Sequence, residues 1–414
     1  MDSISDTNRS LLPRGVSPET LLAEHGPAKP VSARPRLDSL DWLRGLVMVV
    51  MVLDHTRDYL AAGGFNPRDL NDAPLFLTRW ITHFCAPTFV FLAGVSAHLY
   101  GARGRTRSEL SRFLLTRGLW LIFLELVVIR FGWTFSVRME VIVLQVIWAI
   151  GVSLLVLSGL VYLPRAHILT FALALILGHN LLDRFTAANM GSAGWVWMLL
   201  HQQGLLNPGG KIAVLAIYPL IPWIGVLAAG YFFGPAIQAG PPLRRNWTLG
   251  LGTGLTCLFI LLRATNLYGD PLPWSSQSKP LASLLSFVNC EKYPPSLLFL
   301  CMTLGPAMLL LTAAEAFKGR FASILITFGR VPFFFYLAHI FLLHLMAVGW
   351  AQFHDGNSTW LFHGLPPMSK PPGFGFSLPV IYVLWLTAVA MLYPLCRWFA
   401  QLKQHRRDWW LSYL

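Results

Sequence analysis

Two side chains that can do chemistry stand eleven residues apart in an apolar run. Arg44 carries a fixed positive charge, and His55 carries an imidazole that can accept a proton near neutral pH. At about 100° per residue, eleven residues end near 20° from the starting direction, so both side chains project from one helix face. Their axial separation is about 16 Å, roughly half the hydrocarbon thickness of a bilayer. The spacing predicts a cation near the inner membrane surface and an imidazole on the same stripe, deep in the membrane or toward its outer side.

Acidic and basic neighbours surround this histidine. Adjacent helical residues point about 100° apart, so Asp54 is expected to serve Arg57 or a neighbouring helix rather than His55. A structural alternative is that Arg44 extends to the lipid headgroups while His55 sits in an interface belt. Together with Asp54 they favour function, because ionisable groups within spans are costly and usually line a cavity. We therefore take His55 and Asp54 as catalytic candidates and Arg57 as a substrate-binding candidate.

Other histidines lie in later apolar runs. His83 either completes the site with His55 as a third catalytic candidate or packs at the interface. His339 is a substrate-binding candidate, whereas His344, five residues on, points about 140° away, which suits no shared metal ion. No His/Glu pattern in the sequence resembles a zinc site, so no metal is expected.

A polar cluster precedes two consecutive prolines in an outer loop. Lys292 and Tyr293 stand directly before Pro294 and Pro295. They are substrate-binding candidates for an acceptor, and an ordinary loop turn is an equal alternative.

The elements that must position these residues are membrane-spanning helices. Hydrophobic residues make up 55% of the chain and charged residues 12%, about half the charged share of soluble domains. The fold class predicted is therefore all-α, a polytopic transmembrane bundle of about ten helices. The predicted spans are 40–62, 78–101, 113–131, 140–163, 167–185, 213–233, 247–264, 296–317, 324–349 and 376–399.

The charge distribution predicts the orientation. The net charge of +13 is concentrated in short loops between apolar runs, which indicates positive-inside topology and not nucleic-acid binding. Both termini are then cytoplasmic. Residues 1–36, polar and rich in proline, are predicted to be a disordered tail, 37–402 the membrane domain and 403–414 a C-terminal tail.

Several blocks carry a resemblance to a known superfamily. The first is Arg36-Leu-Asp-Ser-Leu-Asp-Trp-Leu-Arg44-Gly followed by Met51-Val-Leu-Asp-His55. The others are Arg79-Trp-Ile-Thr-His83-Phe-Cys-Ala-Pro87, Tyr218-Pro-Leu-Ile-Pro-Trp-Ile-Gly225, Lys292-Tyr-Pro-Pro-Ser296 and Gly329-Arg330-Val-Pro-Phe-Phe-Phe-Tyr336-Leu-Ala-His339. Together they resemble the transmembrane acyltransferase superfamily, in particular a bacterial branch related to the heparan-alpha-glucosaminide N-acetyltransferases, and the acyltransferase-3 proteins.

The resemblance implies acyl transfer across a membrane, most simply the bacterial inner membrane. Acetyl-CoA or another acyl-CoA would bind from the cytoplasm through Arg44, and an outer glycan or small sugar would accept the acyl group. Arg103 and Arg330 are further candidates for binding the CoA phosphates, and positive-inside sorting is the alternative explanation for Arg103. His55 would match the acyltransferase-3 histidine. The lysosomal glucosaminide branch has its proposed catalytic histidine in the outer loop after the first span. No histidine lies between His55 and His83 here, so that assignment does not carry over directly.

A transporter or exporter is the alternative function. Pro and Gly residues interrupt several predicted spans, among them Pro219, Pro222 and Pro332, and such breaks often mark transporter substrate sites. Paired halves are not visible in the sequence. Whether the chain forms a homo-oligomer is left open.

Overall fold

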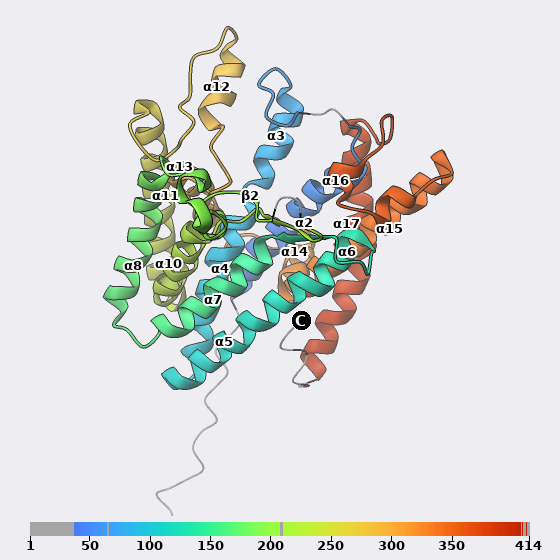
Figure 1. Ribbon diagram of the computed structural model, residues 1–414. Helices are drawn as coiled ribbons and strands as arrows, with labels where there is room; N and C mark the ends of the chain where they lie inside the picture. The colour runs from blue at the N-terminus through green and yellow to red at the C-terminus, as the bar shows by residue number, and fades with distance from the viewer. Residues whose placement is uncertain (1–36, 64–65, 208–209, 407, 409–410, 412–414) are drawn as a thin grey trace, which may run out of the picture. The chain divides into compact units, whose positions relative to one another are not determined.

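The computed structural model describes residues 37–414 apart from 64–65, 208–209, 407, 409–410 and 412–414 (Figure 1). Contacts group Asp38–Leu414 into one compact unit, while the predicted tail 1–36 lies outside the described residues. The helices are α2 (Asp38–Leu60), α3 (Ala73–Thr82), α4 (Cys85–Gly101), α5 (Arg107–Leu124), α6 (Arg130–Thr134), α7 (Val146–Leu160), α8 (Arg165–Gly178), α9 (Gly194–Leu200), α10 (Leu220–Gln238), α11 (Pro241–Thr265), α12 (Pro280–Val288), α13 (Leu297–Ala314), α14 (Arg320–Arg330), α15 (Pro332–Asp355), α16 (Pro366–Ser369) and α17 (Leu378–His405). Short π or 3₁₀ segments are η1 (Glu125–Ile129), η2 (His179–Leu182), η3 (Ala187–Ala193) and η4 (Thr359–Phe362).

The predicted all-α, polytopic fold class is confirmed. Within the described chain, seven helical segments are long and apolar enough to cross a membrane: Ala73–Gly101, Arg165–Leu182, Leu220–Gln238, Pro241–Thr265, Leu297–Ala314, Pro332–Asp355 and Leu378–His405. Helix α2 has 23 residues but carries charged side chains toward both ends, and α7 has 15 residues. The count of about ten spans stays a prediction. Helices α8, α11 and α17 are mostly exposed along apolar faces, a pattern typical of helices that face lipid.

Two predicted spans begin too early, because their first residues form strands. Strand β1 (Val141–Leu144) pairs in parallel with β3 (Ala213–Ala216), and β2 (Gly204–Leu205) pairs antiparallel with β3. Short apolar runs cannot be assigned to strand or helix by periodicity alone, which explains the error. Helix α10 starts only after Pro219.

The predicted span 324–349 is wrong in a different way, because a break divides it. Helix α14 ends at Arg330, and Val331 has φ −131° and ψ 48°, outside the helical region. Pro332 explains this, because a proline ring disfavours helical geometry in the preceding residue. The result is two helices where the sequence predicted one.

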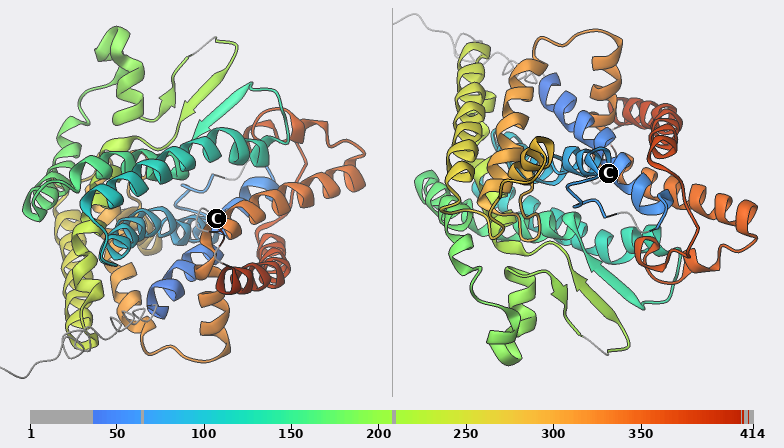
Figure 2. Two further views of the ribbon diagram at one scale, coloured as in Figure 1. Left: turned by 90° about the horizontal axis from the view of Figure 1, so that it is seen from below. Right: turned by 90° about the horizontal axis from the view of Figure 1, so that it is seen from above.

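Helix α2, which carries Arg44 and His55, is surrounded by other helices. It packs against α14, α15, α17 and α4, as the views from several sides show (Figures 1 and 2). The contact with α14 is a backbone crossing at Gly45 and Gly329. A Cβ atom at Gly45 would lie 1.8 Å from the Leu325 carbonyl oxygen, so only glycine permits this approach. The crossing fixes the Arg44 end of α2 against α14.

Candidate functional site

The face of α2 that carries Arg44 and His55 points into the protein. Met48 and Met51 lie on the same stripe between them, and both are buried. Arg44 and His55 are half-buried. The predicted stripe is therefore directed at neighbouring helices, and flexible methionine side chains occupy the length between its two chemical groups.

His55 forms a close pair with His339 of α15. Their Nδ1 and Nε2 atoms are 2.7 Å apart, and the rings stack with centroids 5.0 Å apart. His339 Nδ1 lies 3.0 Å from the carbonyl oxygen of Phe335. That oxygen can only accept, so His339 Nδ1 carries the hydrogen and its Nε2 accepts from His55 Nδ1. In this arrangement His55 Nε2 carries a lone pair, and it has no hydrogen-bond partner among the described residues.

Aromatic rings that the sequence interpretation missed enclose His55. Trp133 meets its ring edge-on at 5.1 Å between centroids, and Tyr336 does so at 6.4 Å. Tyr59 stacks on Trp133 and donates a hydrogen bond to the Gly132 carbonyl oxygen at 3.2 Å. No sequence pattern linked these distant aromatic residues to His55, because α2, α6 and α15 meet only in the fold.

Asp54 pairs with Arg57, as predicted from their helical spacing. The Arg57 Nη2 atom lies 2.5 Å from Asp54 Oδ1 and 3.5 Å from Asp58 Oδ1. Arg57 Nη1 is buried and has no hydrogen-bond partner in the described structure. Asp54 therefore orients the guanidinium group, which keeps one donor for another ligand.

Loop residues predicted to bind a substrate approach this end of α2. Lys292 is buried, and its Nζ atom lies 5.1 Å from the centre of the Tyr293 ring. Burial lowers the pKa of Lys292, but Tyr293 and Asp54 outweigh it, so the pKa is raised and the ammonium stays charged. That charge acts electrostatically on Asp54, His55 and His83.

A second loop lysine, missed from the sequence, borders the same cluster. Lys370 donates a hydrogen bond to the Ala61 carbonyl oxygen at 2.7 Å. Burial lowers its pKa to about 8, against the opposing effect of Asp58. Arg57, Lys292 and Lys370, here called the loop cluster, thus supply positive charge beside the carboxylates of Asp54 and Asp58.

His83 lies in the turn between α3 and α4. Its ring packs against Phe299 at 5.2 Å, and both ring nitrogens are buried without a hydrogen-bond partner in the described part of the chain. No contact between His83 and His55 is found among the described residues. The alternatives of site residue and packed histidine both stay predictions.

The predicted donor-binding arginines occupy two settings. Arg44 bonds Asp41 at 2.8 Å, the Gly329 carbonyl oxygen at 3.2 Å and Ser96 at 3.2 Å. Arg330, which follows Gly329, pairs with Asp38 at 3.1 Å, so it shares the α2–α14 junction with Arg44. Arg103 is exposed in the turn after α4.

Comparisons with known proteins test the family. No curated protein matches the chain. The family described as heparan-alpha-glucosaminide N-acetyltransferase, catalytic, matches residues 36–260, which is more than half of the chain. The match includes Arg44, Asp54, His55, Arg57 and His83. The chain therefore belongs to the heparan-alpha-glucosaminide N-acetyltransferase family of membrane acetyltransferases, as its sequence blocks predicted.

Proposed function

We propose that the protein transfers an acetyl or other acyl group from cytoplasmic acyl-CoA to the hydroxyl or amine of an extracytoplasmic sugar, with His55 as the general base. The observation that carries this is the His55–His339 hydrogen bond of 2.7 Å, which leaves Nε2 of His55 with a lone pair. A thioester is already activated, so the enzyme must mainly position both substrates and remove a proton. Paired neutral imidazoles suit that task.

The reaction balances with the residues present. The acceptor oxygen or nitrogen forms a bond to the acyl carbon while His55 Nε2 takes the acceptor proton. The bond from the acyl carbon to sulfur breaks, and the thiolate leaves with the electron pair. The proton on Nε2 then passes to the thiolate and regenerates neutral His55. His339 is a positioning residue, since it touches His55 and not the reacting atoms.

The acceptor is proposed to bind at the loop cluster of Arg57, Lys292 and Lys370. Arg57 has a buried Nη1 without a partner among the described residues, and the Lys292 ammonium is charged. Donors of this kind suit sugar hydroxyl or carboxylate oxygens. Tyr293 offers a ring face for the sugar, and His83 stays the reserve candidate for a base.

The donor is proposed to bind at the α2–α14 junction. Arg44 and Arg330 both lie at this junction, paired with Asp41 and Asp38 respectively, and guanidinium groups suit the phosphates of CoA. The acyl end reaches His55 along the stripe of Met48 and Met51, which must move aside to admit it. Methionine is well suited to such repacking.

The direct test uses the purified full-length protein in nanodiscs with radiolabelled acetyl-CoA and a panel of sugar acceptors. We expect one free CoA thiol for each acetylated acceptor. Arg44→Ala should raise KM for acetyl-CoA roughly tenfold or more through loss of charge-assisted hydrogen bonds. Exposed Arg245→Ala on α11, the matched control for charge, should change KM far less. Absence of both CoA binding and transfer in the wild type would overturn the proposal.

A transporter is the second candidate. The break between α14 and α15 at Val331 lies beside α2, and discontinuous helices often build transporter sites. Flux of a sugar into proteoliposomes without acyl-CoA would favour this candidate over acyl transfer.

A further inference from the structure

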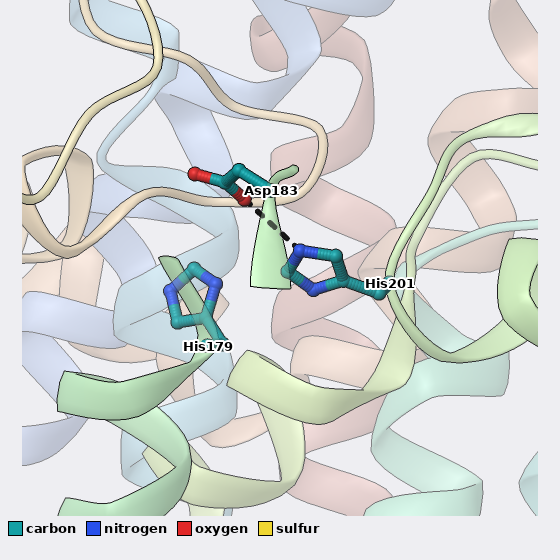
Figure 3. Close-up of side chains that lie close together, drawn as sticks. All are labelled: His179, Asp183 and His201. Atoms are coloured by element: carbon teal, nitrogen blue, oxygen red, sulfur yellow. Dashed lines mark hydrogen bonds and ion pairs between the residues drawn. The ribbon is translucent and has the colours of Figure 1, made fainter. Parts of the chain in front are cut away.

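A second histidine cluster lies where the chain leaves α8. His179 opens η2, Asp183 follows η2, and His201 ends α9 after an intervening segment. Figure 3 shows the two imidazoles and the carboxylate turned toward a common centre. One potential ligand atom from each residue lies within 4.8 Å of the others. The first two are four residues apart, at the two ends of the single 3₁₀ turn η2.

One contact within the cluster is already made. His201 Nε2 lies 2.9 Å from Asp183 Oδ1. The other carboxylate oxygen of Asp183 accepts a hydrogen bond of 2.9 Å from the Asn180 side chain. Asn180 in turn accepts from the Leu297 backbone N–H at 2.9 Å. The carboxylate is therefore held in place from α13.

Three ring nitrogens in the cluster have nothing to bind. Both nitrogens of His179 and Nδ1 of His201 are buried without a hydrogen-bond partner in the described part of the chain. His179 is 1% exposed and His201 is 3% exposed, so bulk water cannot readily reach these nitrogens to form hydrogen bonds with them. An unsatisfied buried polar atom costs about 1–3 kcal/mol. The Asp183–His201 contact gives a partner to two residues of the cluster, but it does not explain why His179 is buried with both nitrogens unsatisfied.

We propose that His179, Asp183 and His201 bind one divalent transition-metal ion of the zinc class. Two imidazoles and a carboxylate are donors that zinc accepts, whereas magnesium and calcium prefer oxygen donors throughout. Ligand atoms in a tetrahedral zinc site lie roughly 3.4 Å apart, given bonds of about 2.0–2.1 Å. The cluster reaches that geometry by a small closure of side chains, and a water molecule completes the coordination. Asn180 would support the bound carboxylate from behind.

The ion would connect parts of the chain that no strand or helix joins directly. His201 stands three residues before β2, and β2 pairs with β3 of the small sheet. His179 and Asp183 lie in and directly after η2, which follows the end of α8. Binding would therefore tie this helix end to the edge of the sheet. The site is independent of the proposed acyl transfer.

The test uses full-length protein in detergent, treated with a chelator and then dialysed, with Co²⁺ as the probe. Visible absorption reports tetrahedral coordination, and titration gives stoichiometry and affinity. We expect one Co²⁺ per chain, displacement by Zn²⁺ and a higher melting temperature with metal. His179→Ala and Asp183→Asn should each weaken Co²⁺ binding by about tenfold or more.

His167→Ala is the matched control, because this exposed histidine stands on the same helix, α8, away from the cluster. It should bind Co²⁺ as the wild type does. The wild-type titration and melting curve need no variant, so they decide the matter even where His179→Ala fails to fold. Absence of stoichiometric Co²⁺ binding to the wild type, or unchanged binding in both site variants, would overturn the proposal.

Discussion

The two histidine clusters differ in how their ring nitrogens are satisfied. In the His55–His339 pair, a backbone carbonyl fixes one ring and that ring fixes the other, so a single lone pair is left at Nε2 of His55. In the second cluster, both nitrogens of His179 lack partners among the described residues. A relay that fixes tautomers suits proton transfer, whereas converging lone pairs suit a cation. The same side chain thus serves two chemistries, according to which hydrogen bonds its surroundings provide.

The largest expected effect is on acetyl transfer and comes from a change in the His55–His339 pair. His55→Ala should lower the rate of acetyl transfer by about 10²–10⁴-fold, because a general base contributes that much. Initial rates with radiolabelled acetyl-CoA measure it, and exposed His405→Ala is the control. If the His55→Ala variant transfers acetyl groups within about threefold of the wild-type rate, His55 is not the general base.

The next effect tests the relay itself. His339→Ala should lower kcat by roughly 10–100-fold with little change in KM, because the base remains but its orientation is lost. His339→Gln offers an amide oxygen to accept from His55 Nδ1 and should restore part of kcat. A raised KM with unchanged kcat would instead assign His339 to substrate binding.

A smaller effect tests the metal site through the sign of a change in melting temperature. Without metal, His179→Leu removes two unsatisfied buried nitrogens, so the melting temperature should rise by about 2 °C or more. With Co²⁺ present, the same variant should melt below the wild type, since it lacks a ligand. Melting curves in both conditions give the two signs. A variant with the same sign in both conditions contradicts the contrast between the clusters.

The smallest effect concerns the support behind the metal ligand. Asn180→Ala removes one hydrogen bond to Asp183 and one from Leu297, and should weaken Co²⁺ binding by about tenfold, less than the loss of a ligand does. Titration of the purified variant measures this. A loss as large as that of Asp183→Asn would indicate that Asn180 is itself a ligand.

The sequence predicted one cluster better than the other for a physical reason. Arg44, Asp54, His55 and Arg57 share one helix, so the helical period alone places them. The partner of His55 comes from α15, and no local pattern could reveal that hydrogen bond. His179 and Asp183 had a usable signal in their four-residue spacing. His201 comes after a separate segment, and no local pattern predicted that this segment folds back onto them.

The errors in the fold follow the same rule. Residues 141–144 and 213–216 are apolar and were therefore included at the starts of two predicted spans. They form strands because they pair with each other across about seventy residues of sequence. The break at Val331 has a local cause in Pro332, yet the predicted span 324–349 ran through it. A local steric effect of this kind can be inferred from the sequence, whereas a long-range strand partner cannot.

The crossing of α2 and α14 has a consequence for how the chain tolerates change. A methyl group at Gly329 would lie 1.8 Å from the Asp41 carbonyl oxygen, just as one at Gly45 would collide with Leu325. The two helices are in backbone contact at this crossing, so adding a single methyl group at either Gly45 or Gly329 would force the helices apart. Arg44 donates a hydrogen bond to the Gly329 carbonyl oxygen, so moving α2 away from α14 would also break this bond and free the guanidinium group to move.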